Sequence, residues 1–302
     1  MQTERSSPRY SSIDRWGASD VLEAMLEGQF AAVAAVHAAR PALERAALAV
    51  EERLRGGGRL AYAGAGTSGR LAVQDGAELM PTFSWPAERL VLLLAGGRDA
   101  LVRAVEGAED TVEQAAQQVR RNVIDARDAL IAVAASGTTP FTVACLLGAK
   151  AAGALTVGIA NNAHTPLLDE ADHAILLDTG AEPIAGSTRM KAGTAQRVAL
   201  TLLSSLVMIR LGRVYEGLMV DLQPTNAKLV RRGEMMLAQL TGHSRDQVRE
   251  ALREAQGSVK LALLLLEGVG HGEARRALER SGGDLRVAKA TLDAARGPRR
   301  RG

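Results

Sequence analysis

Five short apolar runs alternate with segments of helical periodicity through the middle of the chain. The runs are short and mostly apolar at successive rather than alternate positions, and glycine or polar residues bound them. Such runs are typical of strands buried on both faces, as in parallel sheets that helices cover on both sides. We therefore expect an α/β fold with a doubly wound parallel sheet, whose strands are Leu60–Ala63, Leu90–Leu94, Ala129–Ala134, Leu155–Ile159 and His173–Leu177.

Helical patterns occupy both ends of the chain. The polar residues 1–18 predict an extended arm, followed by one helix from Ser19 towards His37 and a second over Pro41–Leu54. Past Asp221 the pattern is helical throughout and carries no strand signal. We expect three segments: an N-terminal arm with helices (1–58), a sheet domain that binds the ligand (59–220) and an all-helical C-terminal domain (221–302).

The helical last third contains a near-repeat at an offset of 26 residues. Each copy reads as a helix, a glycine turn and a second helix. Two copies are too few for a solenoid, so we expect a small helical domain. The matched positions are Ala251 with Ala277, Gly257 with Gly283, Val259 with Leu285, Ala262 with Ala288 and Leu266 with Leu292.

Two loops rich in glycine and hydroxyl groups follow predicted strands. Gly64–Arg70 comes directly after the first strand, and Ser136–Pro140 comes directly after the third. Glycine allows the backbone to approach a ligand closely and to adopt positive φ. Hydroxyls and the free N–H groups of a following helix then suit an anion, most often a phosphate. Because ligands bind at the carboxyl ends of parallel strands, we expect a phosphorylated small molecule there.

A third polar segment, Glu182–Gln196, opens the long helix expected from about Thr188 to Leu211. It places Arg189 and Lys191 in the first helical turn, where the helix dipole disfavours cations. An anionic ligand at this turn would offset that cost. A structural salt bridge with Glu182 accounts for the pattern equally well.

Two acids lie on successive strand–loop–helix units. Glu78 lies in the helix after the first loop, and Pro81 is expected to end that helix. Glu109 follows the second predicted strand. These two acids allow two interpretations. In the first, both are solvated surface acids. In the second, they form a catalytic pair in which one carboxylate is a general base and the other a general acid.

Composition narrows the function classes. The chain has 302 residues, a net charge of +3 and 3% aromatic residues, too few for base-stacking platforms, so we expect no nucleic-acid partner. No apolar run matches a membrane span and no signal peptide is recognisable at the N-terminus, so no membrane partner is expected. Cys145, the only cysteine, excludes an intrachain disulfide and fits a cytoplasmic protein.

The motifs together resemble the N-acetylmuramic acid 6-phosphate etherase family of the sugar isomerase (SIS) superfamily. The resemblance covers nearly the whole chain, from the Thr3–Arg5 arm to the C-terminal helices, and implies a homodimeric SIS-type fold. It rests on five segments in this order: Gly64–Arg70, Asp75–Phe83, Ala104–Asp110, Ala135–Pro140 and Glu182–Gln196.

The resemblance implies a lyase reaction in peptidoglycan recycling. The D-lactyl ether of the substrate is removed by elimination and hydration, giving N-acetylglucosamine 6-phosphate and D-lactate without a metal or other cofactor. Glu78 matches the family's proton donor and Glu109 its second active-site carboxylate. The residues expected to bind the sugar phosphate are Thr67, Ser68, Ser136 and Thr139, with Ser187 and Lys191 nearby.

The chain departs from the family pattern at one position of the second loop. The family's second loop usually has arginine where this chain has Thr138, so a cation is missing beside the expected phosphate.

Two alternative functions stay open. A sugar-phosphate-sensing regulator would bind the same ligand without turnover, and an aldose–ketose isomerase of the same superfamily would release no lactate.

Overall fold

The structure is a computed structural model that describes residues 1–221 and 227–296. The chain divides into two compact units. Unit 1 contains residues 1–77 and 87–207, and unit 2 contains residues 78–86 and those from 208 onwards. The expected segments 1–58, 59–220 and 221–302 follow changes in sequence pattern, and that division stays a prediction.

Unit 1 is built on a five-stranded sheet in which every neighbouring pair is parallel, with the strand order β2-β1-β3-β4-β5. Each predicted strand is confirmed to within a residue at either end. The fold class is therefore α/β, as expected. The strands are β1 (Leu60–Gly64), β2 (Leu90–Leu94), β3 (Ala129–Val133), β4 (Leu155–Ala160) and β5 (His173–Leu176).

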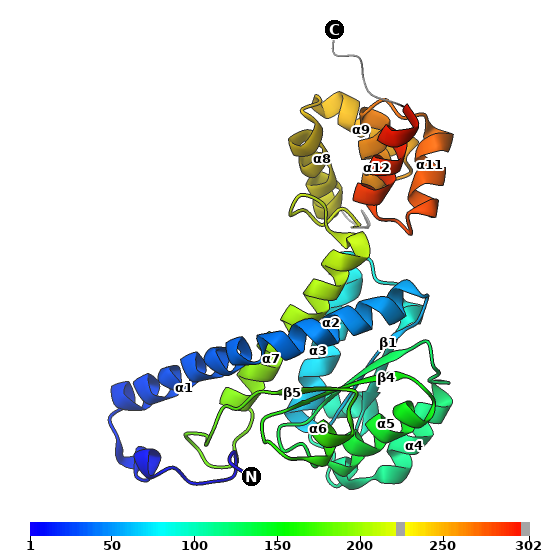
Figure 1. Cartoon of the computed structure of the whole chain (residues 1–302). Coiled ribbons are helices and arrows are strands. Elements are labelled where there is room, and N and C mark those ends of the chain that lie inside the picture. The colour runs from blue at the N-terminus through cyan, green and yellow to red at the C-terminus, as the bar shows by residue number, and fades with distance from the viewer. Residues whose placement is uncertain (222–226, 297–302) are drawn as a thin grey trace. The chain divides into compact units, whose positions relative to one another are not determined.

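Helices cover both faces of this sheet (Figure 1). On one face, α4 (Val112–Arg121), α5 (Pro140–Ala151) and α6 (Pro166–Glu170) close over a buried apolar core that includes Leu130 and Phe141. The other face carries α2 (Arg40–Arg55), α3 (Gly66–Phe83) and α7 (Lys191–Met208). The doubly wound arrangement explains why the strands lack polar alternation.

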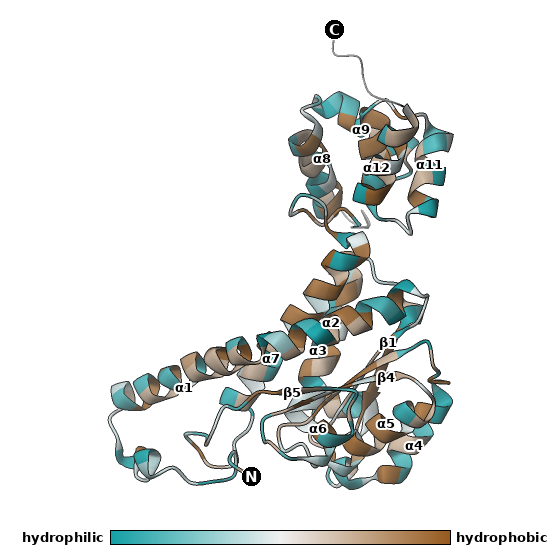
Figure 2. Ribbon diagram, in the orientation of Figure 1, coloured by the Kyte–Doolittle hydropathy of each residue, from teal (hydrophilic) through white to brown (hydrophobic). Residues whose placement is uncertain are grey.

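The N-terminal segment holds two short 3-10 turns, Pro8–Tyr10 and Ile13–Arg15, before helix α1 (Ala18–Ala38). Helix α1 begins after Gly17, at Ala18, one residue before its predicted start at Ser19. The helix carries hydrophobic and hydrophilic residues along its whole length (Figure 2). Four large apolar side chains on one of its faces are exposed: Leu22, Leu26, Phe30 and Val33.

Two helical stretches are long and apolar enough to span a membrane by length and composition alone, Ala18–Ala38 and Lys191–Arg213. Core helices of soluble proteins pass the same test. In the second stretch, 56% of the most apolar window is buried inside the protein. Its apolar character therefore has an explanation in the core of the molecule.

Helix α3 is longer than its sequence predicts. Pro81 lies inside it, and the helix ends at Phe83. Proline lacks the N–H that would bond to the carbonyl four residues earlier, but only two residues follow it before the helix stops. The expectation that Pro81 ends the helix is therefore wrong, and Glu78 lies just before the last turn.

Five complete α-helices of unit 2 lie in its described residues and pack around a core of their own. The predicted repeat is confirmed: α9–α10 and α11–α12 are each joined through a glycine of positive φ, Gly257 (+85°) and Gly283 (+82°). The matched apolar positions are buried, except Leu266, which is partly buried against the same core. The helices are α8 (Ala227–Thr241), α9 (Arg245–Glu254), α10 (Val259–Leu266), α11 (His271–Arg280) and α12 (Leu285–Arg296).

Candidate functional site

The chain reverses its winding direction at the centre of the sheet, between β1 and β3. From β1 the chain passes to β2 on one side, and it later returns to add β3 on the other side. The last residues of the two central strands, Gly64 and Val133, stand in register. Both predicted anion loops therefore leave the sheet at the switch point, where open α/β sheets bind ligands.

The first loop is mostly the first turn of α3. Thr67 and Ser68 lie in this turn, the first half-buried and the second buried. The N–H of Gly69 donates to the carbonyl of Ala65 at 2.9 Å, which leaves the N–H groups of residues 66–68 as the free donors of the helix start. This is the arrangement that suits an anion.

Two glycines set how closely α3 approaches β1. A Cβ on Gly64 would lie 2.8 Å from the Cα of Gly69, and a Cβ on Gly69 would lie 2.7 Å from the carbonyl carbon of Gly64. No side chain fits at either position. The glycines thus bring the start of the helix directly onto the end of the strand.

The second loop holds its hydroxyls together. Ser136 Oγ lies 3.3 Å from Thr139 Oγ1 and accepts a hydrogen bond from the N–H of Thr138 at 3.1 Å. Gly137 between them has φ +73°, and a Cβ there would lie 2.2 Å from Thr165 Oγ1. The two predicted phosphate contacts of this loop are therefore neighbours at the carboxyl end of β3.

The third segment begins its helix later than expected, at Lys191, and the helix is capped by an acid. Both oxygens of the buried Glu182 carboxylate accept backbone hydrogen bonds, from Lys191 N–H at 3.0 Å and from Ala192 N–H at 2.9 Å. Burial nevertheless raises the pKa of Glu182 and lowers that of Lys191. Of the two predicted cations, only Lys191 lies in the first turn of the helix, and its charge interacts with that of Glu182; a salt bridge between their side chains stays a prediction.

Lys191 and Ser187 differ in exposure. Lys191 is buried, and its aliphatic stem would lie 3.0 Å from a Cβ at Gly28 of α1, a tight contact. Ser187 is half-buried in the turn before α7. The roles expected for both residues in binding the sugar phosphate stay predictions.

The first and third segments lie side by side. A Cβ on Gly193, in the first turn of α7, would lie 3.7 Å from the methyl carbon of Thr67. The starts of α3 and α7 are therefore neighbours. Asn161 and Gln196, which sequence reasoning missed, bond at 2.8 Å at the adjoining end of β4; only their amide chemistry could have singled them out.

Glu109 lines a cavity of about 300 Å³ beside the start of α3. The same cavity is lined by Gly66 and Arg70, and the guanidinium of Arg70 donates to the carbonyl of Ala100 at 2.9 Å. Glu109 itself is exposed, in a short 3-10 turn that follows Gly107 (φ +68°). A carboxylate thus lies on the wall of a cavity next to a free helix start.

Glu78 is exposed on the part of α3 that belongs to unit 2. Its expected pairing with Glu109 stays a prediction.

Neither the cysteine nor a metal centre offers a competing site. Cys145 is buried in α5, and burial raises the pKa of its thiol to about 12, so it holds its proton at neutral pH. Among residues 1–221 and 227–296, no three His, Cys, Asp or Glu side chains are grouped in a way that could hold a metal ion.

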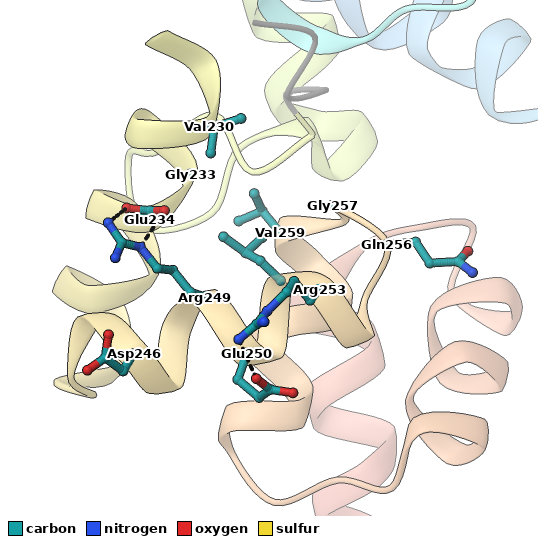
Figure 3. A pocket seen from close by; sticks show the side chains of 11 residues that line it. Val230, Gly233, Glu234, Asp246, Arg249, Glu250, Arg253, Gln256, Gly257 and Val259 are labelled. Carbon is teal, nitrogen blue, oxygen red and sulfur yellow. Dashed lines mark hydrogen bonds and ion pairs between the residues drawn. The ribbon is translucent and has the colours of Figure 1, made fainter. Parts of the chain in front are cut away.

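A larger cavity, of about 820 Å³, lies in unit 2 between α8, α9 and α10 (Figure 3). Both arginines on its wall are already paired with acids, Arg249 with Glu234 at 3.0 Å and Arg253 with Glu250 at 2.5 Å. Its remaining wall is largely apolar, with Val230, Leu252 and Val259. These features do not suit a phosphate.

Comparison with known proteins agrees with this geometry. Residues 43–150 match the glucokinase regulatory protein N-terminal SIS domain, and residues 108–206 match the SIS domain. A putative phosphosugar isomerase involved in capsule formation from Bacteroides fragilis has a similar fold, with a TM-score of 0.51 and 22% identity over 67% of this chain and 95% of that chain.

Curated relatives extend the similarity over nearly the whole chain. The N-acetylmuramic acid 6-phosphate etherase of Deinococcus radiodurans is 50% identical, with 94% of each chain covered. The etherase of Streptomyces avermitilis is 44% identical, with 96% of this chain and 94% of the relative covered. The chain therefore belongs to the N-acetylmuramic acid 6-phosphate etherase family.

Proposed function

We propose that this chain cleaves the D-lactyl ether of N-acetylmuramic acid 6-phosphate, releasing D-lactate and N-acetylglucosamine 6-phosphate. The observation that carries the proposal is the cavity lined by Glu109 beside the free start of α3, at the switch point of the sheet. A phosphate on the N–H groups of residues 66–68 would place a sugar next to this carboxylate.

The elimination needs two proton transfers, and neither the elimination nor the hydration is a redox step. In the open-chain sugar the C2 proton is acidic because it lies next to the C1 aldehyde, and Glu109 removes it as the base. The C3–O bond breaks, and the departing lactate oxygen takes a proton from Glu78 as the acid. Water then adds across the C2–C3 double bond, with the hydroxyl on C3 and the proton on C2.

The hydroxyls at the ends of β1 and β3 position the substrate. In this proposal Thr67, Ser68, Ser136 and Thr139 hold the phosphate, and Ser187 and Lys191 lie close by. Holding the reacting carbons against a fixed base and acid supplies a large share of the rate enhancement.

We further propose that the protein acts as a homodimer in the cytoplasm, in peptidoglycan recycling. The exposed apolar face of α1 supports self-association because its four large side chains fall within one sector of the helix. A second copy would cover surface that is otherwise in water.

Product analysis tests the proposed activity. We expect lactate release from N-acetylmuramic acid 6-phosphate, and in ¹⁸O-water the label should enter the sugar at C3 and not the lactate. A ketose product would favour the isomerase, and binding without turnover would favour the sensor.

Variants test the acid pair. Glu78→Gln and Glu109→Gln should each lower kcat at least about 100-fold and leave the melting temperature unchanged, since both side chains are exposed. Glu113→Gln, which changes an exposed acid of α4, is the matched control. Full activity in either variant would remove that residue from the mechanism.

A further inference from the structure

The extreme N-terminus of the chain is bound at the carboxyl edge of the sheet. Thr3 is fully buried although it is the third residue of the sequence. The oxygen Oδ1 of Asn162 accepts hydrogen bonds from the backbone N–H groups of Gln2 at 2.7 Å and of Thr3 at 3.3 Å. The amide nitrogen of Asn162 donates to Thr3 Oγ1 at 3.0 Å. Backbone and side chain of Thr3 are thus both held by one residue.

Asn162 also connects this arm to the second anion loop. Its amide nitrogen donates to the carbonyl of Ala135 at 2.9 Å, and Ala135 directly precedes Ser136. Because Asn162 follows β4, it joins the N-terminal arm to the end of β3 across two neighbouring strands. Thr3 is therefore linked through Asn162 to the backbone that directly precedes Ser136.

The other side of Thr3 holds the third segment. The N–H of Gly186 donates to the carbonyl of Thr3 at 3.1 Å. Gly186 has φ +75°, and a Cβ there would lie 2.9 Å from the carboxylate oxygen Oε2 of Glu4. The turn that leads into Ser187 and α7 thus packs directly against residues 3 and 4. The arm bridges two of the three segments expected to bind the sugar phosphate.

We propose that Thr3 is a positioning residue, which locks the Ser136–Thr139 loop and the Gly186–Ser187 turn into the geometry that binds a sugar phosphate. Its hydroxyl acts through Asn162 and touches no reacting atom. The inference rests on the proposed function, because it assigns these two loops to the phosphate. Loss of the Thr3 hydroxyl leaves a buried amide donor of Asn162 with one partner fewer, a change that costs free energy in the assembled loop.

Thr3→Val tests the proposal because valine keeps the shape and the backbone bonds but removes the hydroxyl. We expect the KM for lactate release and the Kd for N-acetylglucosamine 6-phosphate to rise about fivefold to tenfold. The kcat should stay close to that of the unchanged protein, and the melting temperature should fall by only about 2–4 °C. Thr3→Ser should restore both constants, and Ser6→Ala, which changes an exposed hydroxyl of the same arm, should alter neither.

A double-variant comparison assigns the effect to the hydrogen bond. Thr3→Val in an Asn162→Ala background should raise the Kd much less than it does alone, because the partner is already missing. A chain that starts at Ser7 removes the whole arm and should bind the sugar phosphate at least as weakly as Thr3→Val.

Other outcomes overturn the proposal. An unchanged Kd in both Thr3→Val and the shortened chain would show that the arm does not support the binding loops. A lower melting temperature with unchanged KM and Kd would assign Thr3 to stability alone. The Kd measurement needs no turnover, so a protein that binds the sugar phosphate but releases no lactate would contradict the proposed reaction and still test Thr3.

Discussion

The carboxylate of Glu182 caps helix α7 by accepting a hydrogen bond from the N–H of Lys191 at 3.0 Å, and its second oxygen accepts from Ala192. A residue nine positions before the helix therefore supplies a negative charge at a helix start whose first turn carries the cation Lys191. This contact makes Glu182 part of the scaffold that holds the third segment.

Glu182→Gln should destabilise the protein. Glutamine offers one oxygen to two backbone donors and leaves the buried ammonium of Lys191 without this acid. We expect a loss of about 2–3 kcal/mol in the free energy of unfolding, measured by chemical denaturation. Glu170→Gln is the control, because its contact with Lys150 at 3.7 Å is exposed and should contribute less than about 1 kcal/mol. Equal losses in the two variants would contradict the capping role.

Asp75 should make stability depend on pH. Its buried carboxylate accepts a hydrogen bond from Tyr62 at 2.8 Å and lies 3.6 Å from Arg197. Burial raises the pKa of Asp75 more than these partners lower it. The stabilising contribution of the protonated acid is then complete below the unfolded pKa and is lost as pH rises through the folded pKa.

Asp75→Asn tests this pH dependence because it keeps the size and the acceptor oxygen but cannot ionise. Relative to this variant, the unchanged protein should lose stability as pH rises from the ordinary aspartate range upwards. Unfolding titrations between about pH 4 and pH 8 measure the difference. Parallel curves for the two proteins would show that the pKa of Asp75 does not change on folding.

Thr138→Arg should strengthen sugar-phosphate binding. Thr138 is exposed on the second loop, next to Ser136 and Thr139, and the family's usual arginine would add a cation there. A charge-assisted contact contributes about 1.5–3 kcal/mol, so we expect a KM at least about tenfold lower at an unchanged kcat. Thr138→Gln is a long, uncharged control. An unchanged KM would show that a cation at this position does not reach the phosphate.

The apolar face of α1 should decide the oligomeric state. Leu26→Asp with Phe30→Asp places two charges on this face, and both side chains are exposed (50% and 69%). The double variant should elute as a monomer in size-exclusion chromatography with light scattering, while its circular dichroism stays native-like. Glu23→Gln alters the same helix at an exposed acid and should leave the proposed dimer intact. A dimeric Asp variant would place the interface elsewhere.

The strands were predictable because a strand that is buried on both faces has apolar residues at successive positions of the sequence. Leu60, Leu93 and Leu130 lie in runs without polar interruption, and all three are buried. The beginnings of the helices were less predictable. Gly66 looks like a loop residue, yet it starts α3, since glycine propensity is overridden where two glycines allow close packing of helix on strand.

The contacts at the site between residues far apart in the sequence could not be predicted from the local sequence. Thr3 bonds to Asn162 across 159 residues, and Thr67 meets Gly193 only once the sheet has assembled. From the sequence alone, a polar residue in an N-terminal arm is predicted to be exposed to solvent, because its sequence neighbours give no indication of burial. The anion loops could be found from composition and spacing, but the residues that hold them in place could not.

The close approach of Gly64 and Gly69 also bears on how this enzyme family can diversify. Any side chain at these positions separates α3 from β1 before a ligand is involved, so selection for a new substrate cannot use them. Gly66 is different, because it has φ +53° and open space around its Cα. A library for altered substrate range should keep residues 64 and 69 and vary 66, where asparagine and aspartate tolerate the left-handed backbone.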